Sequence, residues 1–282
     1  GFDWGNLVRH PEAETIVLKD ANDKRIDYPE TDETTRMRAV VAAYNDLLSR
    51  HVISLSHEED DTDLAGLDFS RRSVNRVFSY GSFELGGRLY GPWWQPASKN
   101  LRRQILIDGS PTVELDYKSQ FAHFAYSSCG LDYMREHPDE AEPDPYALPD
   151  IPRKLSKSAF IIVLNTADRM QAIKAMNREW RDEKFDDVRG LDIAPETIIE
   201  ATLRKHAAIA TMFFRPWGLQ FQCIDSRICE RNIIACLEND TPVLTVHDSF
   251  IVKNEHADWM KGVMYESAED VFPPSIPTIT FG

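Results

Sequence analysis

Two aspartates directly follow short apolar segments, where a carboxylate is costly to bury. Asp116 ends the run Val-Glu-Leu-Asp at 113–116, and Asp248 follows the largely apolar run at 243–247. A carboxylate that is removed from water needs a counter-charge or a metal ion. If the two segments are neighbouring strands, the carboxylates can hold two divalent cations about 3.5–4 Å apart, which supports in-line displacement at phosphorus. Taken singly, each aspartate is more typical of a turn or a helix cap.

A partly basic stripe supplies the complementary charge. Four residues recur at intervals of four within 153–181, a segment whose pattern predicts one long helix: Arg153, Lys157, Ile161 and Asn165. Residues spaced in this way share one face of a helix. The two cations are suited to the phosphates of a triphosphate, and the less polar half to a base or ribose. The alternative is an exposed basic turn with Ile161 in the core.

The charge of the chain is unevenly distributed. Its 282 residues carry 32 basic and 46 acidic side chains, for a net charge of −14, which by itself argues against a nucleic-acid partner. However, seven Lys or Arg and one acid lie within 71–107, and seven and two within 151–181. The acidic runs at 58–68 and 136–150 are typical of solvated loops. Because a phosphate backbone responds to the local field, the two basic segments keep nucleic acid as a candidate partner.

Composition excludes several other classes. No stretch of 18 apolar residues occurs, so we expect no membrane span, and the start lacks the features of a signal peptide, so we expect a cytoplasmic protein. None of the four cysteines forms a C-x-x-C pair, which favours buried free thiols over a zinc site: Cys129, Cys223, Cys229 and Cys236.

The periodicity of apolar residues predicts a mixed α+β fold with a small antiparallel sheet. Helices are predicted over 35–55, 119–128, 153–181, 195–214, 225–237 and 255–271. Strands are predicted over 105–107, 112–116, 242–245 and 250–252, with an Asp-Gly hairpin turn at 108–109. The segment 81–96 is rich in glycine and aromatic residues and is predicted to be loop and turn.

Five segments together resemble the motifs shared by family A DNA polymerases and single-subunit, phage-type RNA polymerases. Glu114-Leu115-Asp116-Tyr117-Lys118-Ser119-Gln120 resembles motif A, with Lys118 inserted into its D-Y-S-Q pattern. Segments 152–158 and 245–250 resemble motifs B and C, and the His-Asp-Ser-Phe form of the latter is closer to the RNA polymerases. Residues 86–90 and 144–146 resemble a Gly-Arg-hydrophobic-Tyr element and an Asp-x-Tyr element of the same superfamily.

The resemblance implies a polymerase-like right hand, with a small antiparallel palm sheet and helical fingers over 81–282 and a helical or irregular N-terminal segment over 1–80. It implies template-directed nucleotidyl transfer that makes RNA, as a primase-like or minimal DNA-directed RNA polymerase. A primer-dependent DNA polymerase and a non-catalytic nucleic-acid-binding palm module are the alternatives. The implied partners are a DNA template, nucleoside triphosphates and a helicase or other replication protein, without a membrane.

The resemblance also implies roles for individual residues. Two Mg²⁺ ions, with Mn²⁺ as the alternative, are expected on Asp116, Asp248 and the carbonyl of Tyr117. Arg153 and Lys157 are expected to hold the triphosphate and to act in catalysis. His247 is expected to position Asp248 or to meet the primer end. Further contacts are expected to the nucleotide from Ile161, Asn165, Tyr117 and Ala122, and to template or hybrid from Arg88, Tyr90, Arg102 and Arg103.

Three features depart from the superfamily pattern. Asn165 and Thr166 stand where these enzymes usually have Tyr and Gly. The residue that senses the ribose 2′-OH is either Phe121, which could exclude ribonucleotides, or Ala122, which would admit them, depending on how Lys118 is accommodated. Only 82 residues separate Asn165 from Asp248. This leaves little room for a promoter-reading insertion and favours a primase-like enzyme over a promoter-driven one.

Overall fold

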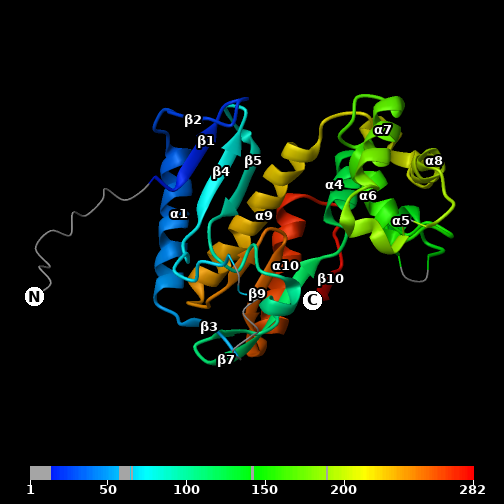
Figure 1. Ribbon diagram of the computed structural model, residues 1–282. Coiled ribbons are helices and arrows are strands. Elements are labelled where there is room, and N and C mark those ends of the chain that lie inside the picture. Colours follow the sequence, from blue (N-terminus) through cyan, green and yellow to red (C-terminus); the bar gives the residue numbers. More distant parts are fainter. Residues whose placement is uncertain (1–13, 57–63, 65, 141–142, 189) are drawn as a thin grey trace, which may run out of the picture.

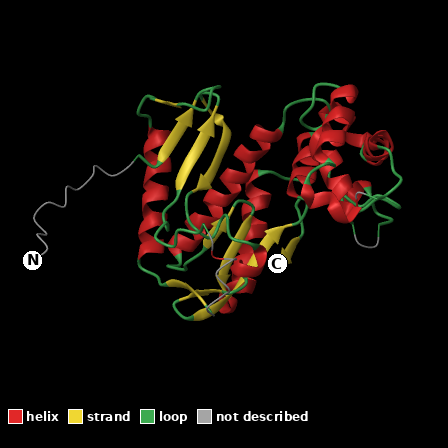
Figure 2. Cartoon of the chain, viewed as in Figure 1, coloured by secondary structure: helices red, strands yellow, loops and turns green. Residues whose placement is uncertain are grey.

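The computed structural model describes residues 14–56, 64, 66–140, 143–188 and 190–282. Most of the acidic run at 58–68 and the start of the chain, where a signal peptide was sought, lie outside the described residues. Two antiparallel-rich sheets and three long helices occupy one side of the molecule, and a group of shorter helices gathers on the other (Figure 1). Figure 2 shows the same division by secondary structure. The chain therefore has the predicted mixture of helix and antiparallel sheet, while the right-hand arrangement stays a prediction.

The first sheet is built mainly from the N-terminal part of the chain. Its order is β2-β1-β4-β5, with β1 and β4 parallel and the other pairs antiparallel. The strands are β1 (Ile16–Lys19), β2 (Arg25–Ile26), β4 (Asn75–Ser79) and β5 (Ser82–Tyr90). Three of them come from the segment 1–80 that was predicted to be helical or irregular. Strands β4 and β5 pair with each other on either side of residue 80, where the sequence analysis divides the chain. The division itself stays a prediction.

Strand β5 corrects the prediction of loop and turn over 81–96. Gly86 and Gly87 both have φ of +83°, and the register with β4 shifts beside them. A side chain at Gly87 would clash with Ser226 of a neighbouring helix, since an added Cβ would lie 2.7 Å from its Oγ. The glycines therefore mark a bulge and a close approach within a strand, rather than the end of one.

The second sheet carries the predicted strands. Its order is β3-β6-β7-β9-β8, and β10 also pairs with β7. The strands are β3 (Ile53–Leu55), β6 (Ile105–Ile107), β7 (Ser110–Tyr117), β8 (Leu244–Val246), β9 (Ser249–Lys253) and β10 (Ile279–Phe281). The Asp-Gly turn between β6 and β7 has positive φ at both residues, as a tight hairpin requires. All pairings in this sheet are antiparallel, as predicted.

The helix predicted over 35–55 is shorter than expected. Helix α1 (Asp32–Ser49) begins after Thr31, whose hydroxyl accepts from the Thr34 backbone N–H while the Thr34 hydroxyl accepts from the Thr31 N–H. This reciprocal cap fixes the start of the helix three residues earlier than the apolar pattern does. Residues 53–55 form β3 instead, because they pair with β6.

The long helix predicted over 153–181 is wrong: the segment forms two helices, α6 (Arg153–Val163) and α7 (Arg169–Glu179). The Thr166 hydroxyl donates to a carbonyl four residues earlier, and Asp168 caps the start of α7 by accepting a backbone N–H at 2.8 Å. Such local side-chain bonds compete with continuation of a helix. The break ends the predicted stripe shortly after Ile161.

The remaining helices complete the two sides. The helical group also contains α4 (Gln120–Ser128), α5 (Tyr133–Glu136) and α8 (Pro195–Lys205), and the helix predicted over 195–214 ends at Lys205 before a 3-10 turn. On the other side lie α3 (Lys99–Arg102), α9 (Gly218–Glu238) and α10 (Ala257–Val271). Three of the free cysteines are buried, as predicted, and Cys129 is partly exposed. Among the helices of the described residues, none combines the length and apolar character needed to cross a membrane.

Candidate active site

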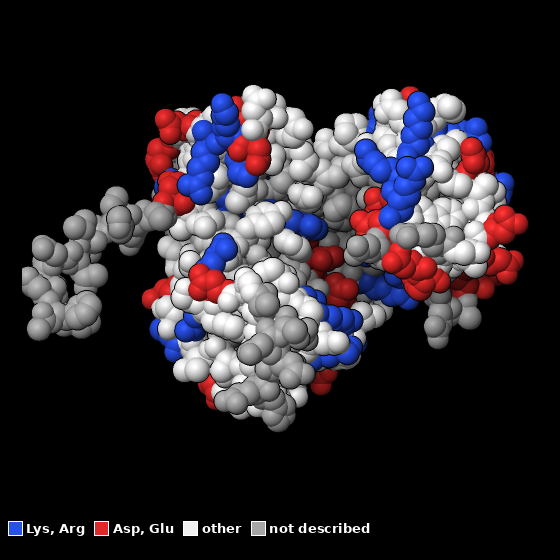
Figure 3. Space-filling model, viewed as in Figure 1, with Lys and Arg blue, Asp and Glu red and all other residues white. Residues whose placement is uncertain are grey.

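Pairing of β7 with β9 brings the two aspartates together. Asp116 lies opposite Ser249, so Asp248, in the turn before β9, is the next residue along the partner strand. The turn is tight because His247 adopts a left-handed conformation with φ of +57°. Both aspartates line one cavity of about 480 Å³, which lies beside the helical group. Figure 3 shows acidic and basic side chains next to each other in the hollow between the two sides of the molecule.

The two carboxylates oppose each other electrostatically. Burial and then the negative charge of Asp248 raise the pKa of Asp116 to about 6, and Glu114 adds a smaller effect. The Ser249 hydroxyl donates to Asp116 Oδ1 at 3.2 Å, and Lys157 also favours the ionised form, but these contributions are smaller. A fold that holds two like charges together at neutral pH gains stability from a cation bound between them.

The donor set fits Mg²⁺. This ion usually binds one or two carboxylates and keeps its other positions for water and substrate phosphates. In the part of the chain that the structure describes, no group of three or more His, Cys, Asp or Glu side chains could hold a metal ion by itself. The third predicted ligand, Tyr117, lines the same cavity, although its side chain is buried and its hydroxyl donates to the Met264 carbonyl at 2.6 Å. Only the backbone of Tyr117 is therefore suited to the predicted role.

Helix α6 presents its cations to the same cavity. Arg153, Lys157 and Ile161 all line it, as the predicted stripe requires. Arg153 donates from Nε to Asp144 Oδ2 at 2.6 Å and from Nη2 to the Ser119 hydroxyl at 3.1 Å. Lys157 has no ion-pair partner among the described residues.

Asn165 is separated from the other residues of the stripe. It lies beyond the end of α6, where its Nδ2 donates to the Ile161 carbonyl and its Oδ1 accepts from the Gly218 backbone N–H, both at 2.8 Å. Asn165 therefore joins α6 to the first residue of α9. It lines a second, more apolar cavity of about 640 Å³ that shares Phe121 and Ile161 with the first. Asn165 thus connects α6 to α9, and the nucleotide contact expected of it stays a prediction.

Of Phe121 and Ala122, the two alternatives for the residue that senses the ribose, the cavity is lined by Phe121. Ala122 is fully buried and does not line the cavity, whereas Phe121 forms part of its wall. Ser119 has φ of +58°, and this left-handed residue lies directly between the inserted Lys118 and the start of α4. The turn before α4 thus presents the aromatic ring to the cavity and buries Ala122, while the nucleotide contact expected of Ala122 stays a prediction.

Arg88 lines the cavity and has a buried partner that sequence analysis missed. Its Nε donates to Asp225 Oδ2 at 2.6 Å, and its guanidinium lies 5.8 Å from the centre of the Phe121 ring. Burial disfavours the charge on Arg88, but Asp225 and Asp248 outweigh it and raise the pKa of Arg88. Asp225 is 2% exposed on α9, in a segment whose helical pattern gave no reason to single it out.

The other residues predicted to contact nucleic acid differ in their surroundings. Tyr90 is 41% exposed and lies edge-on to the His247 ring at 5.4 Å, close to the site. Arg103 is exposed. Arg102 forms an ion pair within the fold, in which its guanidinium binds both carboxylate oxygens of Glu114 at 2.9 and 3.0 Å. For His247, burial and the charge of Arg88 lower the pKa.

No protein-family model matches this chain, and no curated protein matches it. Among solved structures, the chain is similar to the POL domain of Pol1 from M. smegmatis, in complex with DNA primer-template and dNTP, with a TM-score of 0.36 and 13% sequence identity. The match covers 89% of this chain and 51% of that chain, so this chain spans about half the length of that structure. The chemistry of the site therefore has to follow from its own residues.

Proposed function

We propose that this chain catalyses template-directed nucleotidyl transfer from a nucleoside triphosphate. The observation that carries the proposal is one cavity lined by two like-charged aspartates of the sheet and two cations of α6, Asp116 and Asp248 facing Arg153 and Lys157. Carboxylates that hold divalent cations and cations that bind phosphates are the two charge sets that phosphoryl transfer needs. The order of the motifs along the chain adds the template-directed character.

The basic and acidic residues of the cavity have different proposed roles. Arg153 and Lys157 bind the triphosphate and neutralise the charge that develops on the leaving pyrophosphate. Asp116 and Asp248 hold Mg²⁺, which when bound supplies Lewis-acid stabilisation of the phosphate and activates the attacking hydroxyl. The hydroxyl of Ser249 fixes one oxygen of Asp116. His247 contacts the primer end, and Tyr90, whose ring lies edge-on to that of His247, contacts the template or hybrid.

The position of Phe121 favours deoxyribonucleotides as substrates. An aromatic ring in the cavity wall leaves less room for a 2′-hydroxyl than the alanine that the RNA-making prediction required. This observation supports the primer-dependent DNA polymerase over the primase-like enzyme. The non-catalytic module is the weakest alternative, because a binding module has no use for two carboxylates that repel each other.

Synthesis on a single-stranded DNA template with Mg²⁺ tests the proposal. Deoxyribonucleotides and ribonucleotides are compared with and without a primer, for the unchanged chain, Asp248→Asn and the matched control Asp240→Asn, whose side chain is 70% exposed. Primed product that disappears in Asp248→Asn and persists in the control supports the proposal. Product that persists in Asp248→Asn, or no product under any condition, contradicts it.

A second variant tests the choice of sugar. Phe121→Ala removes the ring from the cavity wall, so we expect ribonucleotide incorporation to rise relative to deoxyribonucleotide incorporation. An unchanged ratio would show that another group senses the ribose. Unprimed ribonucleotide synthesis by the unchanged chain would restore the primase-like assignment.

A further inference from the structure

Lys205, the last residue of α8, is a nearly buried cation outside the catalytic cavity. Its side chain is 13% exposed. The ammonium group has three N–H donors. It donates to the Asp144 carbonyl at 3.0 Å and to the Ala147 carbonyl at 2.8 Å, and it lies 3.0 Å from a carboxylate oxygen of Glu140. All three donors therefore have acceptors close to one short loop, residues 144–147, which we call the Asp144 loop.

The two carbonyls between these also accept from side chains. Pro145 O accepts from His206 Nε2 at 3.0 Å, and Tyr146 O accepts from the Ser156 hydroxyl. Because a carbonyl can only accept, His206 carries its proton on Nε2, and its Nδ1 accepts from the Tyr126 hydroxyl at 3.1 Å. Four consecutive carbonyls thus have side-chain donors, and residues 144–146 are buried, where a carbonyl cannot turn to water instead. These donors hold the Asp144 loop in one conformation.

The Asp144 loop is the platform on which the cations of α6 rest. The Asp144 carboxylate contacts Arg153 along the Nε and Nη2 edge, at 2.6 and 3.3 Å. The Tyr146 ring lies 5.4 Å from the Arg153 guanidinium carbon and 6.0 Å from the Lys157 nitrogen. Asp144 occupies the edge of the Arg153 guanidinium that carries Nε and Nη2. The remaining nitrogen, Nη1, has no hydrogen-bond partner among the described residues. One edge of the guanidinium is therefore fixed and the other is available to a phosphate.

We infer that Lys205 is a positioning residue for the triphosphate. It acts through the Asp144 loop, which sets the orientation of Arg153, and does not touch the substrate itself. The inference rests on the proposed function for the identity of its ligand. It makes Lys205, 52 residues beyond Arg153 in the sequence, a determinant of nucleotide affinity.

Binding of dATP with Mg²⁺ to the full chain, measured by calorimetry, tests the inference. We expect Lys205→Met to weaken binding about tenfold, since it removes a charged donor from two carbonyls at once. Lys205→Arg keeps the donors and should restore affinity to within about threefold. Lys174→Met, which alters an exposed lysine without an ion pair among the described residues, serves as the matched control and should bind like the unchanged chain.

A double-mutant cycle separates positioning from a general loss of structure. If Lys205 acts through Arg153, Lys205→Met should change affinity less than about twofold when Arg153 is already alanine. An equal loss in both backgrounds, or no loss in either, overturns the inference. Thermal melting first shows that each variant is folded, and Lys205→Gln replaces Lys205→Met in the cycle if the latter is not.

Measurements of dATP binding and of synthesis can contradict the inference and the proposed function separately. Lys205-dependent dATP binding in a chain that makes no product would contradict the proposed function and leave the positioning role intact. Template-directed synthesis with dATP affinity that is indifferent to Lys205 would overturn the inference alone.

Discussion

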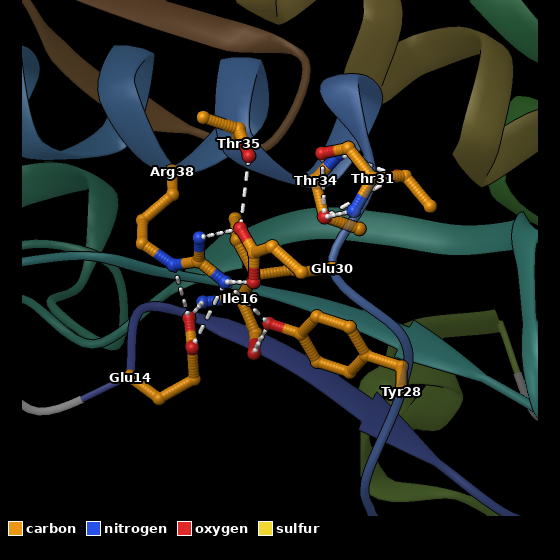
Figure 4. A network of polar contacts seen from close by, with 8 residues as sticks. All are labelled: Glu14, Ile16, Tyr28, Glu30, Thr31, Thr34, Thr35 and Arg38. Atoms are coloured by element: carbon orange, nitrogen blue, oxygen red, sulfur yellow. Dashed lines mark hydrogen bonds and ion pairs between the residues drawn. The ribbon is translucent and has the colours of Figure 1, made fainter.

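Two pairs of carboxylates in this chain meet opposite electrostatic surroundings. Beside the start of α1, Glu14 and Glu30 share the guanidinium of Arg38, whose Nη1 lies 2.6 Å from Glu30 and whose Nη2 lies 3.1 Å from Glu14 (Figure 4). Hydrogen bonds from Arg38 lower the pKa of Glu30. For Glu14, burial is the largest single effect and raises the pKa, but Arg38 and the backbone N–H of Ile16 together outweigh it and lower the pKa. In the cavity, burial and Asp248 raise the pKa of Asp116 instead.

The difference separates a structural use of charge from a functional one. At α1 one cation serves two acids, and the Tyr28 hydroxyl adds a further contact at 3.4 Å from Arg38 Nη2. In the cavity, Arg88 pairs with Asp225 and Arg153 with Asp144, and the charge of Lys157 offsets the burial and repulsion at Asp116 only in part. Excess negative charge at Asp116 and Asp248 is thus left for a ligand to neutralise. Sites of this kind are commonly maintained at some loss of stability.

The largest effect should come from removing one of the unneutralised acids. We expect Asp248→Asn to lower primed synthesis at least about a thousandfold, because a cation ligand and its charge are lost together. Glu30→Gln makes the same kind of change at the neutralised pair and should leave the rate within about twofold. Rates are measured at saturating nucleotide. Comparable losses in the two variants would remove the functional distinction between the regions.

A smaller effect is expected at Lys157, a cation of the cavity with no ion pair among the described residues. Lys157→Ala should raise the KM for the nucleotide about tenfold, since one charged contact to a phosphate is lost. Arg38→Ala removes a cation of the neutralised pair and should leave this KM unchanged. Steady-state kinetics with varied nucleotide distinguish the two. An unchanged KM in Lys157→Ala would remove that residue from the triphosphate site.

The dependence of stability on pH should show the effect of His206, a buried side chain that is neutral when the chain is folded. Burial lowers the pKa of His206 to about 3, so the folded chain stays unprotonated while the unfolded chain binds a proton below about pH 6.5. Stability is therefore lost as the pH falls below that value, and His206 accounts for about 2 kcal/mol between pH 7.5 and 5. We expect His206→Gln to flatten the dependence of the unfolding free energy on pH over this interval. A slope equal to that of the unchanged chain would contradict this account.

The smallest expected effect is also the most direct test of the comparison, because its sign differs between the two regions. Without Mg²⁺ at pH 7.5, Asp116→Asn should stabilise the chain by about 1 kcal/mol, since it relieves the repulsion from Asp248. Glu14→Gln should lower the melting temperature, because it weakens the contact with Arg38. Addition of Mg²⁺ should raise the melting temperature of the unchanged chain and not that of Asp116→Asn. Calorimetric melts of the three proteins decide the matter.

Local patterns predicted the elements that carry the aspartates. The Asp-Gly turn and the short apolar runs on either side specify β6 and β7 without help from distant residues. The spacing of Arg153 and Lys157 likewise specifies a shared helix face. These features depend on neighbours in the sequence, and a single sequence is enough to find them.

Features that depend on distant contacts were missed or misjudged. The glycines of β5 indicate a loop until β4 and α9 are placed against them, and Asn165 gains its role only from Gly218. Whether Phe121 or Ala122 faces the cavity depends on the left-handed conformation of Ser119. The sequence does not reveal this conformation, because the inserted Lys118 leaves the register of the motif open. Buried partners on other helices, such as Asp225 and Lys205, leave no local signal.

The pairing of Asp116 with Ser249 joins residues that are 133 positions apart. A contact of that span closes a large loop, and loop-closure entropy makes such pairings slow to form. On a ribosome, β7 emerges well before β9 exists. The nascent chain therefore carries β7 with only its pairing to β6, and without β9, for as long as the intervening residues take to be translated. Because Asp116 and Asp248 both line the cavity, its wall cannot be complete before synthesis has reached β9.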